Sequence, residues 1–161
     1  MKKLTLVRHA KSSWEYDVID HERPLKKRGY NDADLVSNRL KRENFKINLV
    51  MSSDAVRAKT TAEIFIRNLD IDKNIIKFNH ELYDFSGESL IEVIKNCDDS
   101  VDSLMIFGHN HAITAFVNTY GDKYIVNVPT TGLVVFKFDI EKWSDLKPGE
   151  TVLTIFPKDL K

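Results

Sequence analysis

Two short runs of almost wholly apolar residues, 4–7 and 104–107, constrain the fold of this chain more than any other feature of its sequence. A run that is apolar on both faces is typical of a central strand in a parallel sheet, which helices cover on both sides. Further short apolar runs alternate along the chain with segments whose apolar residues recur at helical spacing. The sequence therefore predicts an α/β fold with three layers, α/β/α, around a mostly parallel central sheet.

The same patterns predict where each element lies. Strands are expected at residues 4–7, 49–52, 75–78, 104–107, 133–138 and 152–156. Helices are expected at residues 27–42, 55–69, 90–97 and 112–118, with Ser53 or Asp54 capping the second of them. No helical pattern separates the last two strands, so they are expected to form an antiparallel edge of the sheet.

Length and composition limit the classes of function. The 161 residues, of which 42% are hydrophobic, predict a single domain over residues 1–161. Lysine plus arginine and aspartate plus glutamate both total 24, so the overall charge predicts neither nucleic acid nor an anionic membrane as a partner. The sequence shows no signal-peptide core and no apolar stretch of about 20 residues that would span a bilayer, which makes a cytoplasmic location the default expectation.

The single cysteine, Cys97, removes several alternatives. It allows no internal disulfide, as is usual in a reducing compartment. A cysteine-dependent phosphatase needs an arginine six positions after its nucleophile, and Ser103 stands there instead. The chain also lacks a glycine-rich phosphate loop ending in Gly-Lys-Ser/Thr and a Gly-x-Ser-x-Gly elbow, so nucleotide hydrolysis and serine acyl transfer have no scaffold.

Each of the two apolar runs is followed directly by a histidine. Arg8 and His9 come after the first run, and Gly108 and His109 after the second. Because the carboxyl ends of parallel strands meet at one edge of a sheet, residues roughly a hundred positions apart in sequence can share one pocket there. Two imidazoles and a guanidinium are suited to phosphoryl chemistry.

Several sequence blocks, in their order along the chain, resemble the histidine phosphatase superfamily with its phosphoglycerate-mutase-like fold, and within it the small SixA-type phosphohistidine phosphatases. The main blocks are Val7-Arg8-His9-Ala10-Lys11-Ser12, Ser52-Ser53-Asp54-Ala55-Val56-Arg57-Ala58 with Thr61-Ala62, and Gly108-His109-Asn110. Supporting blocks lie at residues 11–14, 23–25, 28–29, 81–83, 129–132 and 157–160. The resemblance covers essentially the whole chain.

The resemblance implies a metal-free hydrolase that works through a covalent phosphohistidine at His9. His109 would donate a hydrogen bond to the transferred group, while Arg8 and Arg57 neutralise its charge. Crowding by the two arginines is expected to keep the ring of His9 neutral. The residues expected to bind the substrate phosphate are Arg8, Ser12, Arg57, His109 and Asn110.

Larger relatives carry a catalytic carboxylate after the third strand, and Asp84 stands in that neighbourhood, with Glu81 just before it. Asp84 is therefore predicted to protonate the leaving group. A phosphohistidine leaves readily once it is protonated, so such an acid would be dispensable for that substrate.

Three positions depart from the wider superfamily. Ala10 replaces a commoner glycine, as in the SixA-type branch. Glu15 stands where many relatives have an asparagine that touches phosphate, and His111 where the SixA-like pattern has proline. Whether these two residues contact the phosphate stays open from the sequence.

No metal and no cofactor are expected. His109 and His111 form a His-x-His pair, but no third ligand stands at metal-binding spacing. His21 and His80 are interpreted as ordinary loop residues.

The segment between Asp84 and Leu104 has room for one helix and no long insertion that would close over a small substrate. An open pocket of this kind favours a phosphorylated protein, in particular a phosphohistidine domain, as the partner. Small phosphoesters are an alternative substrate class. A mutase of the same fold and a phosphate-binding module without catalysis are alternative functions.

Overall fold

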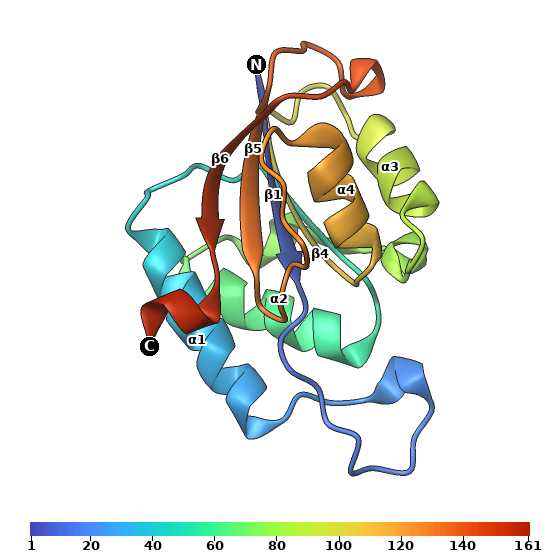
Figure 1. Ribbon diagram of the computed structural model, residues 1–161, viewed down its shortest axis with the longest axis vertical. Coiled ribbons are helices and arrows are strands. Elements are labelled where there is room, and N and C mark those ends of the chain that lie inside the picture. Colours follow the sequence, from blue (N-terminus) through green and yellow to red (C-terminus); the bar gives the residue numbers. More distant parts are fainter.

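A six-stranded sheet forms the centre of the molecule in the computed structural model, which describes all residues 1–161 (Figure 1). The strands are β1 (Lys2–Arg8), β2 (Leu49–Ser52), β3 (Ile76–Phe78), β4 (Ser103–Gly108), β5 (Leu133–Phe138) and β6 (Glu150–Ile155). They lie in the order β3-β2-β4-β1-β5-β6. The first four run parallel, whereas β5 is antiparallel to β1 and β6 is antiparallel to β5. The predicted fold class, with antiparallel pairing of the late strands at one edge, is confirmed.

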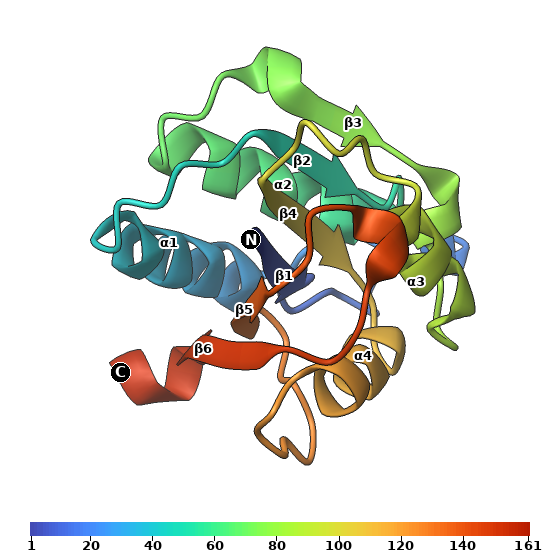
Figure 2. The same ribbon diagram turned by 90° about the horizontal axis from the view of Figure 1, so that it is seen from above.

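Helices cover both faces of the sheet, as Figure 2 shows. They are α1 (Lys27–Lys41), α2 (Val56–Asn68), α3 (Glu88–Lys95) and α4 (Ala112–Tyr120). Apolar residues of α1 and α2 form one core with one face of the sheet, and those of α3 and α4 form a second core with the other face. None of the four helices combines the length and the hydropathy that crossing a bilayer requires.

The two apolar runs of the sequence lie side by side in the middle of the sheet. β1 and β4 pair in parallel with Leu4 opposite Leu104 and Arg8 opposite Gly108. The backbone N–H of His9 then donates to the carbonyl oxygen of Gly108 at 3.0 Å, so the pairing continues past the ends of both strands. This register brings the two histidine-bearing segments to the same edge of the sheet.

One local prediction is wrong. Helix α2 begins at Val56 after Ala55, and no side chain caps its first turn. The hydroxyl of Ser53 instead accepts a hydrogen bond from the Ala55 N–H, while the carboxylate of Asp54 is bonded to His21 and His80. Both side chains are held by contacts at the edge of the sheet and are not available to the helix.

Candidate active site

A pocket of about 450 Å³ opens at the edge of the sheet where β1 and β4 end. It is lined by Arg8, His9, Lys11, Ser12, Trp14, Asp20, Arg23, Arg57, Phe85, Asn110 and Thr130. A larger groove, of about 710 Å³, lies beside α2 and β3, but no histidine lines it. The chemistry that the sequence predicts therefore belongs to the smaller pocket.

His9 presents one particular ring nitrogen to this pocket. Its Nδ1 lies 2.7 Å from the carbonyl oxygen of Ala10. A carbonyl oxygen only accepts hydrogen bonds, so Nδ1 carries the proton and donates it, and we assign the unprotonated nitrogen as Nε2. The lone pair of Nε2 is the nucleophile that this geometry makes available.

The ring of His9 is neutral mainly because it is buried, a cause that the sequence does not reveal. Its side chain is buried, and this burial is the main cause that holds its pKa well below the ordinary 6.5. The nearby ring of His109 and the charges of Arg57 and Arg8 lower the pKa further. Crowding by the arginines thus acts in the expected direction, but desolvation is the larger effect.

His109 lies behind the pocket lining, 1% exposed, with its ring centroid 5.2 Å from that of His9. Its Nε2 is 2.8 Å from the hydroxyl oxygen of Ser53, which already accepts a hydrogen bond from the Ala55 N–H. The Ser53 hydroxyl can donate its proton to Nε2, and in that tautomer Nδ1 of His109 carries the ring proton. That Nδ1–H is buried and has no partner. Burial, followed by the charge of Arg57, lowers the pKa of His109 to about 3.

Each of the two predicted arginines has one N–H group without a hydrogen-bond acceptor. Arg8 donates from Nη1 to the carbonyl oxygen of Val128 at 2.9 Å, and Arg57, 2% exposed, donates to Asp20. The Nε–H groups of both arginines are buried without an acceptor. Thr61 fixes α2, and with it Arg57, against the loop after β1, since its hydroxyl accepts from the Ala10 N–H and donates to the Arg57 carbonyl.

The unpartnered donors are suited to binding an anion. Nε of Arg8, Nε of Arg57 and Nδ1 of His109 are the only buried side-chain nitrogens in the chain that have no hydrogen-bond partner. Each such group costs about 1–3 kcal/mol when it is left unsatisfied. Their common location at one sheet edge, next to the nucleophilic Nε2 of His9, is what a phosphoryl group with its several oxygens would satisfy.

Residues 4–82 match the family model of the histidine phosphatase superfamily, branch 1. The chain belongs to this superfamily. An uncharacterized protein of Mycobacterium tuberculosis strain H37Rv is 28% identical over 160 residues, covering 93% of this chain and 98% of its own length. An uncharacterized chloroplastic protein of Arabidopsis thaliana is 32% identical over 119 residues, or 68% of this chain and 54% of that protein.

Solved structures share the fold of this histidine phosphatase. A chain assigned as the phosphohistidine phosphatase SixA of Agrobacterium tumefaciens has a TM-score of 0.80 at 24% identity, with 96% of this chain and 97% of that chain covered. A SixA complexed with tungstate also has a TM-score of 0.80, at 20% identity and 99% coverage of both chains. A phosphoglycerate mutase of Bacillus anthracis has a TM-score of 0.63 at 16% identity, covering 90% of this chain and 95% of its own. The family and the site together identify a phosphatase enzyme.

The pocket of this histidine phosphatase contains a carboxylate that sequence reasoning missed. Asp20 accepts hydrogen bonds from Arg57 Nη2 at 2.9 Å, from Arg23 Nε at 3.0 Å and from the Tyr83 hydroxyl at 2.5 Å. Burial acts to raise the pKa of Asp20, but the bonds from Tyr83 and Arg57 outweigh it and hold the pKa far below its ordinary range. Asp20 is therefore ionised, and it positions Arg57. No motif in the loop identified it in advance.

The other predicted phosphate contacts lie at the pocket but are already engaged. The hydroxyl of Ser12 accepts a hydrogen bond from Arg23 Nη1 at 2.7 Å. The amide of Asn110 donates to Asn127 Oδ1 at 2.7 Å, and its oxygen accepts from the hydroxyl of Thr114 at 2.8 Å. Glu15 and His111, whose roles the sequence left open, are exposed and do not line the pocket.

The structure does not bring Asp84 to the pocket. Its carboxylate accepts hydrogen bonds from the backbone N–H groups of Ser86, Gly87 and Leu90, and from the Ser86 hydroxyl. These bonds satisfy donors at the first turn of α3, which is the task of a helix cap. These contacts favour a capping role for Asp84, and its placement outside the pocket lining does not support the predicted role as general acid.

Replacing Asp84 by alanine is expected to lower the free energy of unfolding by about 0.5–2 kcal/mol, because α3 loses its cap. The kcat/KM is expected to stay within about twofold of the parent value, because the carboxylate is engaged at the start of α3 and does not line the pocket. Urea unfolding and initial rates check the two effects. The exposed Asp139→Ala serves as a control that should change neither, and a large loss of kcat/KM in D84A would restore the catalytic role.

Neither His9 nor His109 is expected to titrate between about pH 5 and 8, the range in which an ordinary histidine changes charge. Because both folded-state pKa values lie below the ordinary 6.5, the unfolded chain binds protons in acid that the folded chain does not. Stability should therefore fall as the pH drops below about 6.5. Imidazole nitrogen shifts measured by NMR test this prediction, and a midpoint near 6.5 for either ring would contradict it.

Proposed function

We propose that this histidine phosphatase hydrolyses a phosphoryl group through a covalent phosphohistidine on His9, and that the substrate is a phosphohistidine side chain of a protein. One observation carries the mechanism. Nε2 of His9, freed by the bond from Nδ1 to the Ala10 carbonyl, shares a sheet edge with three unpartnered buried donors of Arg8, Arg57 and His109. A nucleophile and a set of anion donors are the two parts that phosphoryl transfer needs.

The reaction takes place in two displacements. The lone pair of His9 Nε2 forms a bond to phosphorus, while the bond from phosphorus to the departing imidazole nitrogen breaks and its electron pair stays on that nitrogen, which takes a proton from solvent. The oxygen of a water molecule then attacks phosphorus, gives up a proton to solvent, and displaces Nε2, which releases inorganic phosphate. Arg8 and Arg57 neutralise the phosphoryl oxygens, and the Nδ1–H of His109 donates to them.

The composition of the pocket supports a leaving group that needs little acid assistance. Asp20 is the only carboxylate that lines it, and its lowered pKa keeps it ionised. The departing oxygen of an ordinary phosphoester needs a proton donor, whereas an imidazole nitrogen is a much better leaving group. A site without a protonated carboxyl therefore fits a phosphoramidate such as phosphohistidine better than an unactivated ester.

The surroundings of the pocket support a macromolecular substrate. Trp14 and Phe85 line the pocket with 75% and 47% of their surfaces exposed. The loop that continues from Trp14 also exposes Tyr16, Val18 and Ile19. Several exposed apolar side chains on one short loop, at the mouth of a polar pocket, are typical of a protein interaction surface.

The test compares kcat/KM for a phosphohistidine-bearing protein with kcat/KM for a small phosphoester such as para-nitrophenyl phosphate. We expect the protein to be preferred by at least about 100-fold, which corresponds to roughly 2.7 kcal/mol of additional transition-state stabilisation. Ile19→Ser on the exposed loop should lower turnover of the protein and leave that of the small ester unchanged. Phe78→Ser, at an exposed apolar residue that lines the separate groove beside α2, is the matched control. Negligible turnover of the phosphohistidine protein, with good turnover of the ester, would remove the substrate claim.

A further inference from the structure

A second cluster of titratable side chains lies outside the phosphate pocket. It consists of His21 in the 3₁₀ turn at Asp20–Glu22, Asp54 after β2, and His80 in the 3₁₀ turn at His80–Leu82. Nε2 of His21 is 2.8 Å from Asp54 Oδ1, and Nδ1 of His80 is 3.0 Å from both carboxylate oxygens of Asp54. Three segments far apart in the sequence thus bring two imidazole nitrogens and one carboxylate to a single point.

We propose that His21, Asp54 and His80 bind one divalent transition-metal ion of the zinc class. Two imidazole nitrogens and a carboxylate oxygen are a preferred ligand set for such an ion, with water in the fourth position. Their donor atoms all lie within 4.8 Å of one another. Ligands of a tetrahedral ion at ordinary bond lengths are about 3.3 Å apart, so small side-chain rotations are enough to admit the ion.

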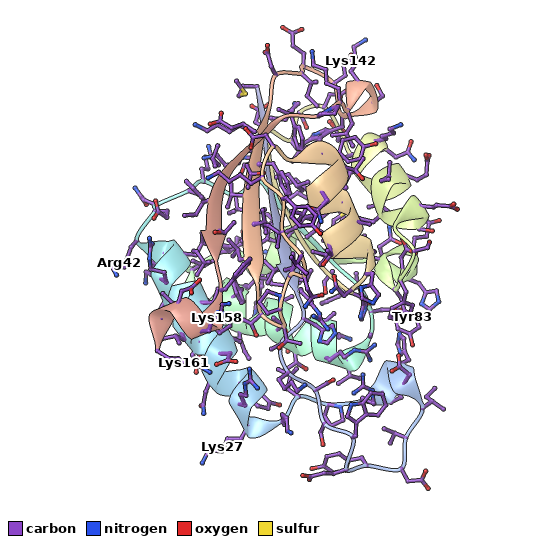
Figure 3. The ribbon with its side chains drawn as sticks, in the orientation of Figure 1. Lys27, Arg42, Tyr83, Lys142, Lys158 and Lys161 are labelled. Atoms are coloured by element: carbon purple, nitrogen blue, oxygen red, sulfur yellow. The ribbon has the colours of Figure 1, made fainter.

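The carboxylate of Glu22 lies near the second ring nitrogen of His21, at an ion-pair distance that is longer than a hydrogen bond. Nε2 of His21 faces Asp54, while its other ring nitrogen, Nδ1, lies 3.6 Å from a carboxylate oxygen of Glu22. A metal-binding histidine commonly donates its second N–H to a carboxylate, which orients the ring and makes it a stronger ligand. Tyr83, labelled in Figure 3, packs against both imidazoles, with ring centroids 5.0 Å from His21 and 5.7 Å from His80.

The position of the cluster gives the ion a role. His21 directly follows Asp20, Asp54 stands three residues before Arg57, and His80 stands three residues before Tyr83. Asp20, which lines the pocket, accepts hydrogen bonds from both Arg57 and Tyr83. An ion that joins the three ligand segments would therefore brace the contacts that hold Arg57 in place. The proposal that these three residues bind a metal ion does not rest on the proposed phosphatase reaction.

The test is a titration of the full chain, free of any affinity tag, with Co²⁺ followed by visible absorption, and with Zn²⁺ in competition. We expect one equivalent to bind with the intense bands of a tetrahedral site. His80→Ala and Asp54→Asn should each weaken binding by more than the roughly 10–100-fold that loss of an outer partner costs, and Glu22→Gln by about that amount. His80 is 72% exposed and bonds only to Asp54, so its removal does not threaten the fold.

Two controls identify the ligands. His111→Ala removes an exposed histidine outside the cluster, and His9→Ala removes one ring of the buried pair in the phosphate pocket. Both should bind Co²⁺ as the parent chain does. Absence of saturable binding in the parent chain, or binding that H80A and D54N leave unchanged, overturns the proposal.

Discussion

Replacing His9 by alanine is expected to lower kcat/KM by about 10⁴-fold or more while leaving the affinity for inorganic phosphate or tungstate nearly unchanged. The variant loses the nitrogen that forms the covalent intermediate in the proposed mechanism. It keeps Arg8 and Arg57, whose guanidinium groups carry the charge that attracts the anion. Turnover and anion affinity therefore separate in this variant, as they would not if His9 only contributed to the shape of the pocket.

Initial rates and anion titrations on the same preparations measure the two quantities. His111→Ala is the matched control, because it removes an exposed imidazole near the sheet edge without touching the pocket lining. Turnover in H9A close to that of the control would show that water attacks phosphorus directly. Loss of anion binding in H9A would show instead that the ring supports the pocket and that its chemistry has been misassigned.

Replacing Arg57 by alanine is expected to lower kcat/KM by about 10²–10³-fold, the range seen when one preorganised donor to a transition-state charge is lost. Arg57→Lys should recover little of the lost kcat/KM. The guanidinium holds Asp20 with two nitrogens and has a third, Nε, for an anion, whereas an ammonium has a single nitrogen and no planar fork. The loss should therefore be as large in the lysine variant as in alanine, within the error of the rates. If R57K had the kcat/KM of the parent chain, only the positive charge of Arg57 would matter for the reaction.

The same substitution has a stability effect that depends on pH. The bonds from Tyr83 and Arg57 outweigh burial and lower the pKa of Asp20, so its contribution to stability is present above its ordinary value of 3.8 and is lost as the pH falls through the folded-state value. R57A removes part of that contribution. Urea unfolding should show R57A less stable than the parent chain at neutral pH, with a smaller difference in strong acid. If the difference in the free energy of unfolding were equal at the two pH values, the ionisation of Asp20 would not depend on Arg57.

The centre of the fold is predictable because its signals are local. Residues 4–7 and 104–107 are apolar on both faces, which predicts buried central strands, and the carboxyl edge of a parallel sheet is a general location for ligands. From these two facts the meeting of His9 and His109 follows without knowledge of the register. The structure then supplies that register, with Arg8 opposite Gly108.

The parts that were missed depend on contacts between loops. Asp84 stands at the expected sequence position for a general acid, but its carboxylate lies within reach of the amides of its own following helix and is used there. Asp20 lies in a polar loop with no periodic pattern, and only the packing of that loop on α2 shows that it binds Arg57. In the sequence His21 and His80 are indistinguishable from ordinary loop residues for the same reason.

A crystal structure of this histidine phosphatase with tungstate bound tests the proposed phosphate site most sharply. We expect the anion at the ends of β1 and β4, with Nε2 of His9 next to tungsten. Nitrogens of Arg8 and Arg57 and Nδ1 of His109 should be bonded to its oxygens. An anion that binds elsewhere, or a His9 ring that turns Nδ1 toward the anion, would contradict the proposal.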